Sequence, residues 1–180
     1  MSRFHLSVAL LVLLFTFFGM SVVATVPLLP ARVATHFDAA GEPNGWMTRD
    51  DHLGFMCGFG LAFPLGIIGI CWSVRFLPVG CLNIPHKEYW LAKEHRAETD
   101  DYLFRHSIWL GCLGVGFVTG LHWVTVLSNL CQPVQLPVVW VVGVAGSFLT
   151  GTALWVICLF RRFRIPVGAR EASVTSVENR

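Results

Sequence analysis

The chain has 180 residues, a formal net charge of +2, and a composition that is 54% hydrophobic and only 13% charged. A water-soluble domain carries about 25% charged residues, so this composition excludes an ordinary soluble domain. The polar segments are too short to bury a core of their own. We therefore expect a single membrane domain over residues 1–180.

Four apolar runs predict four membrane-spanning helices, because a span needs about 20 apolar residues. We place the spans at residues 5–26, 53–76, 106–130 and 137–160. No Lys, Arg, Asp or Glu lies between Arg105 and Arg161, and Pro133 and Pro137 mark a turn inside that stretch. The expected fold is an all-α integral membrane protein with an ordered outer loop (27–52), a charged cytoplasmic helical segment within loop 77–105, and a cytoplasmic tail (161–180).

Basic residues are unevenly distributed between the two sides of this topology. Eleven of the 13 Lys and Arg residues fall on the side of the two termini, and only Arg32 and Arg49 fall opposite. The positive-inside bias then predicts cytoplasmic termini and residence in the inner (plasma) membrane. The basic cluster Arg161–Arg164 fits a topology signal and an attraction to anionic lipid better than a nucleic-acid site. A signal peptide cleaved after Ala24 is the alternative to an uncleaved first span, although the apolar run is long for one.

Small residues at four-residue spacing mark surfaces where membrane helices approach closely. Three spans carry such stripes, and the first does not. We therefore expect spans two to four to pack together and the first to be more peripheral. The stripes are Gly54, Gly58, Ala62 and Gly66; Cys112, Gly116 and Gly120; and Gly143, Ser147 and Gly151.

The outer loop has signals of local order. Val33–Phe37 favours an extended segment, and Ala40-Gly41 and Asn44-Gly45 favour two tight turns. Thr48, with Asp51 three residues later, resembles a capping box that begins the second span near Arg49.

The loop pattern also resembles a known family. Leu29-Pro30, His36-Phe37, Gly41, Pro43 and Gly45-Trp46 lie between two spans, as in the small bacterial membrane domain of unknown function at the N-terminus of SdpI-like proteins. A second matching element is Asn83–Trp90 in the cytoplasmic loop. The resemblance implies a bacterial inner-membrane protein. The best-understood relatives protect against a secreted killing peptide and relay its presence to a regulator, but they have a further membrane half that this chain lacks.

Two groups of residues are the candidate ligand- or partner-binding positions. The outer group is His36, Phe37, Asp38, Gly41, Pro43, Gly45 and Trp46, and the cytoplasmic group is Pro85, Tyr89 and Trp90. His36, Asp38, Glu42 and His52 could in principle share a divalent metal, but His36 bonding to loop backbone is the preferred interpretation, since no metal-binding signature is present. We expect no metal and no cofactor.

His122 is the one ionisable side chain, cysteines aside, well inside a predicted span, which makes it a functional candidate. Thr119, Thr125, Ser147 or Thr150 could instead satisfy its ring. No catalytic constellation is visible. We expect a non-enzymatic sensing, immunity-like or envelope protein that binds an extracytoplasmic peptide or membrane protein and a cytoplasmic regulator, without nucleic acid. The alternative is a small transporter or transporter subunit that uses His122 and the glycine-lined interface.

Overall fold

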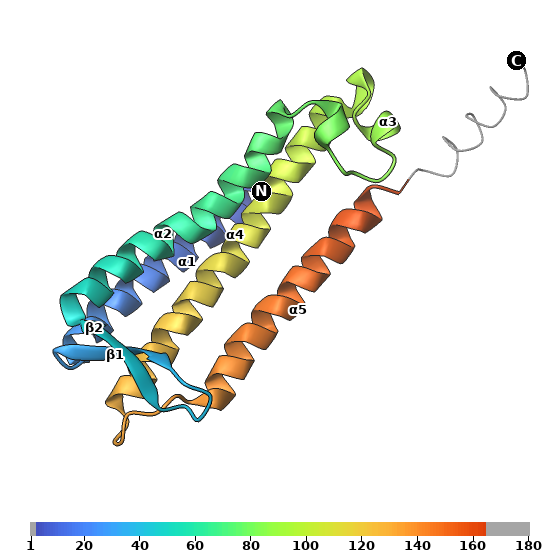
Figure 1. Cartoon of the computed structure of the whole chain (residues 1–180). Coiled ribbons are helices and arrows are strands. Elements are labelled where there is room, and N and C mark those ends of the chain that lie inside the picture. The colour runs from blue at the N-terminus through green and yellow to red at the C-terminus, as the bar shows by residue number, and fades with distance from the viewer. Residues whose placement is uncertain (1–2, 165–180) are drawn as a thin grey trace, which may run out of the picture.

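The computed structural model describes residues 3–164. Four long helices run back and forth along one axis: α1 (Arg3–Thr25), α2 (Arg49–Ser73), α4 (Lys93–Leu130) and α5 (Val138–Arg162) (Figure 1). All four are long and apolar enough to cross a membrane. The expected all-α membrane architecture is therefore confirmed. The tail beyond Arg164, including Arg170 and Arg180, lies outside the described residues.

Short elements connect the helices at the two ends of the bundle. One end, here called the hairpin end, carries a 3-10 turn (Val26–Leu28) and the antiparallel strands β1 (Arg32–Phe37) and β2 (Pro43–Thr48). The other end, here called the α3 end, carries two 3-10 turns (Val74–Phe76 and Val79–Cys81) and the single-turn helix α3 (Lys87–Trp90). α4 has 38 residues, which is about 57 Å of helix and more than a bilayer core needs. Its charged first turns therefore extend beyond the apolar layer.

α4 is the central helix, and α1, α2 and α5 each pack on it. The apolar core lies toward the hairpin end, where Phe18 and Val22 of α1, Met56 of α2 and Val118 of α4 are buried together. By contrast, α5 has no buried residue and stands apart from α1 and α2 in Figure 1. The expectation of a peripheral first span is therefore wrong, because α5 is the outlying helix.

Glycines explain which helices approach closely, but not in the expected registers. A Cβ added to Gly54, Gly58 or Gly66 of α2 would meet nothing within 4 Å, so this predicted stripe is not an interface. α2 instead packs on α4 through Gly111, whose added Cβ would lie 2.5 Å from Ile68, and Gly114, 3.5 Å from Pro64. The α4–α5 contact uses two of the predicted glycines, as added Cβ atoms on Gly120 and Gly151 would each lie 2.8 Å from Val144 and Leu113, respectively.

The start of α2 is as the sequence predicts. The Thr48 hydroxyl accepts a hydrogen bond from the Asp51 N–H at 3.1 Å and lies 2.6 Å from Asp51 Oδ2. Asp50 and Asp51 in the first turn also suit the positive end of the helix dipole. These contacts fix the direction in which β2 leads into α2, and so place the hairpin over the end of the bundle.

Candidate functional site

The hairpin is joined to the helices by side chains that bond to its backbone. The Ala34 N–H donates to Asn129 Oδ1 at 2.8 Å, and Asn129 Nδ2 donates to the Ala34 carbonyl at 2.9 Å. Asn129 is buried near the end of α4, and it makes with Ala34 the two backbone hydrogen bonds that a neighbouring strand would make. Arg49 Nη1 donates to the Leu29 carbonyl at 3.3 Å. The strands are thus held against the bundle at two places.

The tip of the hairpin is a turn organised by Asp38. Asp38 Oδ1 accepts hydrogen bonds from the N–H groups of Ala40 and Glu42, both at 2.9 Å. Gly41 has φ +83°, a conformation that favours glycine, and its carbonyl accepts from the Leu136 N–H at 2.9 Å. Asp38 and Gly41 therefore shape the loop and attach it to the α4–α5 connection.

The second predicted turn is wrong, because Asn44 and Gly45 lie inside β2. Gly45 pairs with His36, and a Cβ added to Gly45 would lie 2.8 Å from the His36 Cβ. Position 45 requires glycine because the His36 side chain lies against it, and any larger residue would collide with that side chain. The pairing is irregular on both sides of His36, which distorts the hairpin there.

One face of β2 is open. Asn44, Trp46 and Thr48 are exposed, and the residues that alternate with them are half-buried. Trp46 is 42% exposed and has no ring contact with Phe37.

The outer edge of β2 is also unpaired. Ala34 pairs with Trp46 across the hairpin, and its backbone groups point away from β2 and bond to Asn129. In an antiparallel pair of this kind the backbone groups of Trp46 also point away from the partner strand. In the described part of the chain these groups have no hydrogen-bond partner, so β2 has a free edge.

A buried histidine pair lies beneath the hairpin. His52 of α2 and His122 of α4 are 2% and 0% exposed, and their rings stack with centroids 5.8 Å apart. His122 Nε2 lies 2.7 Å from Thr25 Oγ1, and the Thr25 hydroxyl donates to the Ser21 carbonyl. His122 Nε2 is then the donor to Thr25, which leaves His122 Nδ1 as an acceptor. Within residues 3–164, His122 Nδ1 and both nitrogens of His52 have no hydrogen-bond partner.

The surroundings of both histidines differ from those that the sequence predicts. His122 bonds across to α1, not to the predicted hydroxyl groups of α4 or α5. His52 is buried between helices, away from the proposed metal cluster of His36, Asp38 and Glu42. No group of three or more potential His, Cys, Asp or Glu ligands occurs among the described residues. The Thr35 hydroxyl, not the loop backbone, bonds His36 Nδ1 at 3.2 Å.

At the α3 end, Trp90 joins the segment between α2 and α4 to the last helix. It is 5% exposed, its Nε1 donates to the Phe163 carbonyl at 3.1 Å, and the Arg162 guanidinium lies 4.3 Å from its ring centroid. Tyr89 stacks on His95 with ring centroids 4.4 Å apart, and Pro85 is half-buried. Trp90 thus has a packing role, and Tyr89 lies beside it at the surface of the same segment.

Sequence reasoning missed the side chains that connect distant segments. Asn129 and Ala34 are 95 residues apart, as Thr25 and His122 are 97 apart, so no local pattern pairs them. Asn129 did carry one signal, because an amide side chain within an apolar stretch needs a partner. The free edge of β2 had no such signal, since Asn44-Gly45 is typical of a turn.

The fold and this site define a class: a four-helix membrane protein with a small hairpin fastened over one end. Residues 11–56 match the family model for a domain of unknown function, DUF1648. The match covers about a quarter of the chain, from most of α1 through the hairpin into α2. It confirms the resemblance to a membrane domain of unknown function over this segment, but does not test the likeness to SdpI-like proteins. No curated protein and no solved structure matches the chain.

Proposed function

We propose that the chain is a non-enzymatic membrane protein whose hairpin binds an extracytoplasmic partner in sensing, protection or envelope maintenance. The observation that carries the proposal is the combination of a free β2 edge with the exposed Trp46 on a hairpin bonded to buried Asn129. An exposed aromatic ring on a fixed backbone binds at little entropic cost. A free strand edge accepts an extended peptide through main-chain hydrogen bonds. A secreted peptide or an extended segment of an envelope protein has the required chemistry.

Binding of a partner to the hairpin would be transmitted to the other end of the bundle through packing contacts. A peptide that pairs with β2 pushes or rotates the hairpin, and Asn129 transmits that movement to α4. The buried histidine pair lies close by on α2 and α4, so its stacking reports the relative position of these two helices. A cytoplasmic regulator would then meet the α3 end, where Tyr89 and the charged start of α4 lie.

Site-specific photocrosslinking in living cells tests the hairpin proposal. A photoreactive amino acid at Asn44, on the exposed face of β2, is expected to give one discrete adduct. The same amino acid at Leu13, an exposed position of α1, supplies the control for contact with lipid and neighbouring membrane proteins. The adduct should weaken in a Trp46→Ala background while the amount of protein in the membrane stays unchanged. Equal adducts at both positions, or no effect of Trp46→Ala, would contradict the proposal.

A small transporter is the second candidate function, and the histidine pair favours it. Two buried imidazoles with three unpartnered nitrogens can accept and release protons inside a membrane domain. The test is proton movement in reconstituted vesicles that contain either the full chain or its His122→Gln variant. Flux that is lost in the variant supports transport, and equal flux in vesicles with variant, wild type or no protein excludes it.

A further inference from the structure

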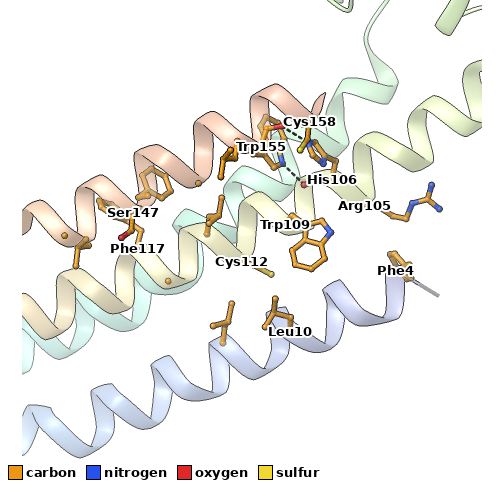
Figure 2. Close-up of a pocket in the computed structure, with 18 of the residues that line it drawn as sticks. Phe4, Leu10, Arg105, His106, Trp109, Cys112, Phe117, Ser147, Trp155 and Cys158 are labelled. Atoms are coloured by element: carbon orange, nitrogen blue, oxygen red, sulfur yellow. Dashed lines mark hydrogen bonds between the residues drawn. The ribbon is translucent and has the colours of Figure 1, made fainter. Parts of the chain in front are cut away.

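A long apolar groove opens between α1 and α5, with α4 as its floor. Its volume is about 1450 Å³, and a smaller hollow of about 520 Å³ continues it toward the hairpin end, sharing Leu14, Gly116, Trp140 and Val144 with it. Figure 2 shows Leu10, Trp109 and Cys112 between α1 and α4, with Ser147 and Trp155 on the α5 side. The lining is almost entirely apolar, and the groove faces the layer that lipid would occupy.

The groove is kept open by contacts that hold α5 to α4. His106 Nε2 lies 3.0 Å from the Trp155 carbonyl, Trp155 Nε1 donates to the His106 carbonyl at 2.8 Å, and the two rings stack. Glycines make room within the groove, because a Cβ added to Gly116 or Gly143 would meet nothing within 4 Å. The space is therefore set by the helix arrangement and is not filled by neighbouring side chains.

The mouth of the groove at the α3 end is cationic. Arg105 lines it, is exposed, and forms no ion pair or hydrogen bond with another described residue. Arg161 lies three residues beyond the groove-lining Cys158, a spacing that places both on one side of α5. Tyr102 and Trp109 also line the groove, about one helical turn to either side of Arg105 along α4, as aromatic side chains do near lipid headgroups. An apolar slot that ends at arginines with no ion-pair partner among residues 3–164 is suited to an anionic lipid.

We propose that this groove binds one two-chain anionic phospholipid, with its phosphate at Arg105 and its acyl chains along α4. A water molecule in the liquid takes about 30 Å³, and we assume the same volume for each methylene group. Two acyl chains of about 16 carbons then need roughly 1000 Å³, which the groove accommodates. A spanning helix from a second copy is about 10 Å wide and 30 Å long, roughly 2400 Å³, which is more than the groove holds. The lipid satisfies both the volume and the charge. This proposal is independent of the hairpin and its partner.

Native mass spectrometry of the full chain in mild detergent tests this site. The added probes are synthetic phosphatidylglycerol and phosphatidylcholine with identical acyl chains. One phosphatidylglycerol per chain is expected, in preference to phosphatidylcholine. Arg105→Gln should weaken phosphatidylglycerol binding about fivefold, the effect of one arginine near an anionic headgroup, and leave phosphatidylcholine binding unchanged.

A pair of glycine variants separates the groove from the rest of the lipid-facing surface. Gly116→Leu should abolish the bound lipid because its side chain enters the groove. Gly58→Leu makes the same change on the open surface of α2 and should bind lipid like the wild type. Equal melting temperatures for the two variants show that both fold. The proposal is overturned if Gly116→Leu retains the lipid, if the two lipids bind equally and without regard to Arg105, or if the chain is a dimer that Gly116→Leu dissociates.

Discussion

Single side chains that bond to distant backbone groups fix the hairpin end of this molecule. Asn129 satisfies both backbone groups of Ala34, and Arg49 satisfies the Leu29 carbonyl. A buried backbone group that loses its hydrogen-bond partner destabilises the fold. Asn129 and Arg49 therefore contribute more to stability than the energy of the hydrogen bonds that they form. The hairpin is consequently an extension of the helix bundle and not a freely moving loop.

Asn129→Ala tests this role. The substitution leaves the Ala34 N–H and carbonyl unpaired, which should destabilise the hairpin by about 1–3 kcal/mol. Hydrogen exchange at β1 and β2 should accelerate accordingly while α1 stays protected. Ser128→Ala is the matched control, because Ser128 is buried next door but bonds only within its own helix, to Val124. Similar exchange in both variants would show that Asn129 does not hold the hairpin.

The contact between Thr25 and His122 provides a second prediction at this scale. Thr25→Val removes the hydroxyl and leaves every nitrogen of the histidine pair unpartnered, at a cost of about 0.6–2 kcal/mol. Thr16→Val is the control, since Thr16 lies in the same helix and bonds only to the Val12 carbonyl. Unfolding in mixed detergent measures both variants. If both lose the same stability, the bond across α1 and α4 contributes nothing.

At the scale of elements, the molecule divides into a close three-helix group of α1, α2 and α4 and an outlying α5. Two tryptophans fasten α5 at its C-terminal end: Trp155 to the His106 carbonyl, and Trp90 to the Phe163 carbonyl. Glycines bring α5 near α4 at Gly120 and Gly151. The width of the groove therefore depends on a few identifiable contacts.

Trp155→Phe should loosen this attachment. It keeps a ring stacked on His106 but loses the indole donor, so α5 is expected to lose about 0.5–1.5 kcal/mol of its docking energy. Distances between spin labels on α4 and α5 should broaden, as measured by pulsed electron resonance. Trp140→Phe, at an exposed position whose indole N–H has no described hydrogen bond, should leave the distribution unchanged. A sharp distribution in Trp155→Phe would contradict the assigned role of that bond.

Local sequence signals predicted the elements better than their packing. The lack of charge between Arg105 and Arg161, the Thr48–Asp51 cap and the Val33–Phe37 segment each depend on neighbouring residues, and each is found in the structure. The partner of a helix is not local information, because a lipid-facing surface is as apolar as a helix-facing one. For this reason the spacing of the α2 stripe predicts an interface, although the stripe lies on the open surface.

The candidate site was predictable to a similar degree. The sequence singled out the loop, Trp46 and His122 as candidates, but it did not indicate what surrounds them. Asn44-Gly45 favours a turn in isolation, yet the Asp38 turn comes first and carries the chain back as β2. His52 precedes the apolar run, which predicts a place in the outer loop, but the Thr48 cap places it one turn inside α2. Its stacking on His122, 70 residues away, follows from tertiary packing alone.

At the scale of the whole molecule, the two ends of the bundle differ in chemistry. The hairpin end presents a small sheet and the α4–α5 connection, whereas the α3 end collects most of the charged residues. The positive-inside bias predicts that the α3 end faces the cytoplasm and the hairpin faces outward. Both proposals depend on this orientation, because it presents the hairpin to extracytoplasmic partners and the Arg105 mouth to the anionic inner leaflet.

The native cysteines permit the most direct measurement of this arrangement. Cys131 is exposed at the hairpin end and Cys81 is exposed at the α3 end. Two variants, each retaining only one of these cysteines, are treated in intact cells with a membrane-impermeant maleimide. The account predicts labelling of Cys131 in intact cells and of Cys81 only after lysis. Labelling of Cys81 but not Cys131 in intact cells would contradict it.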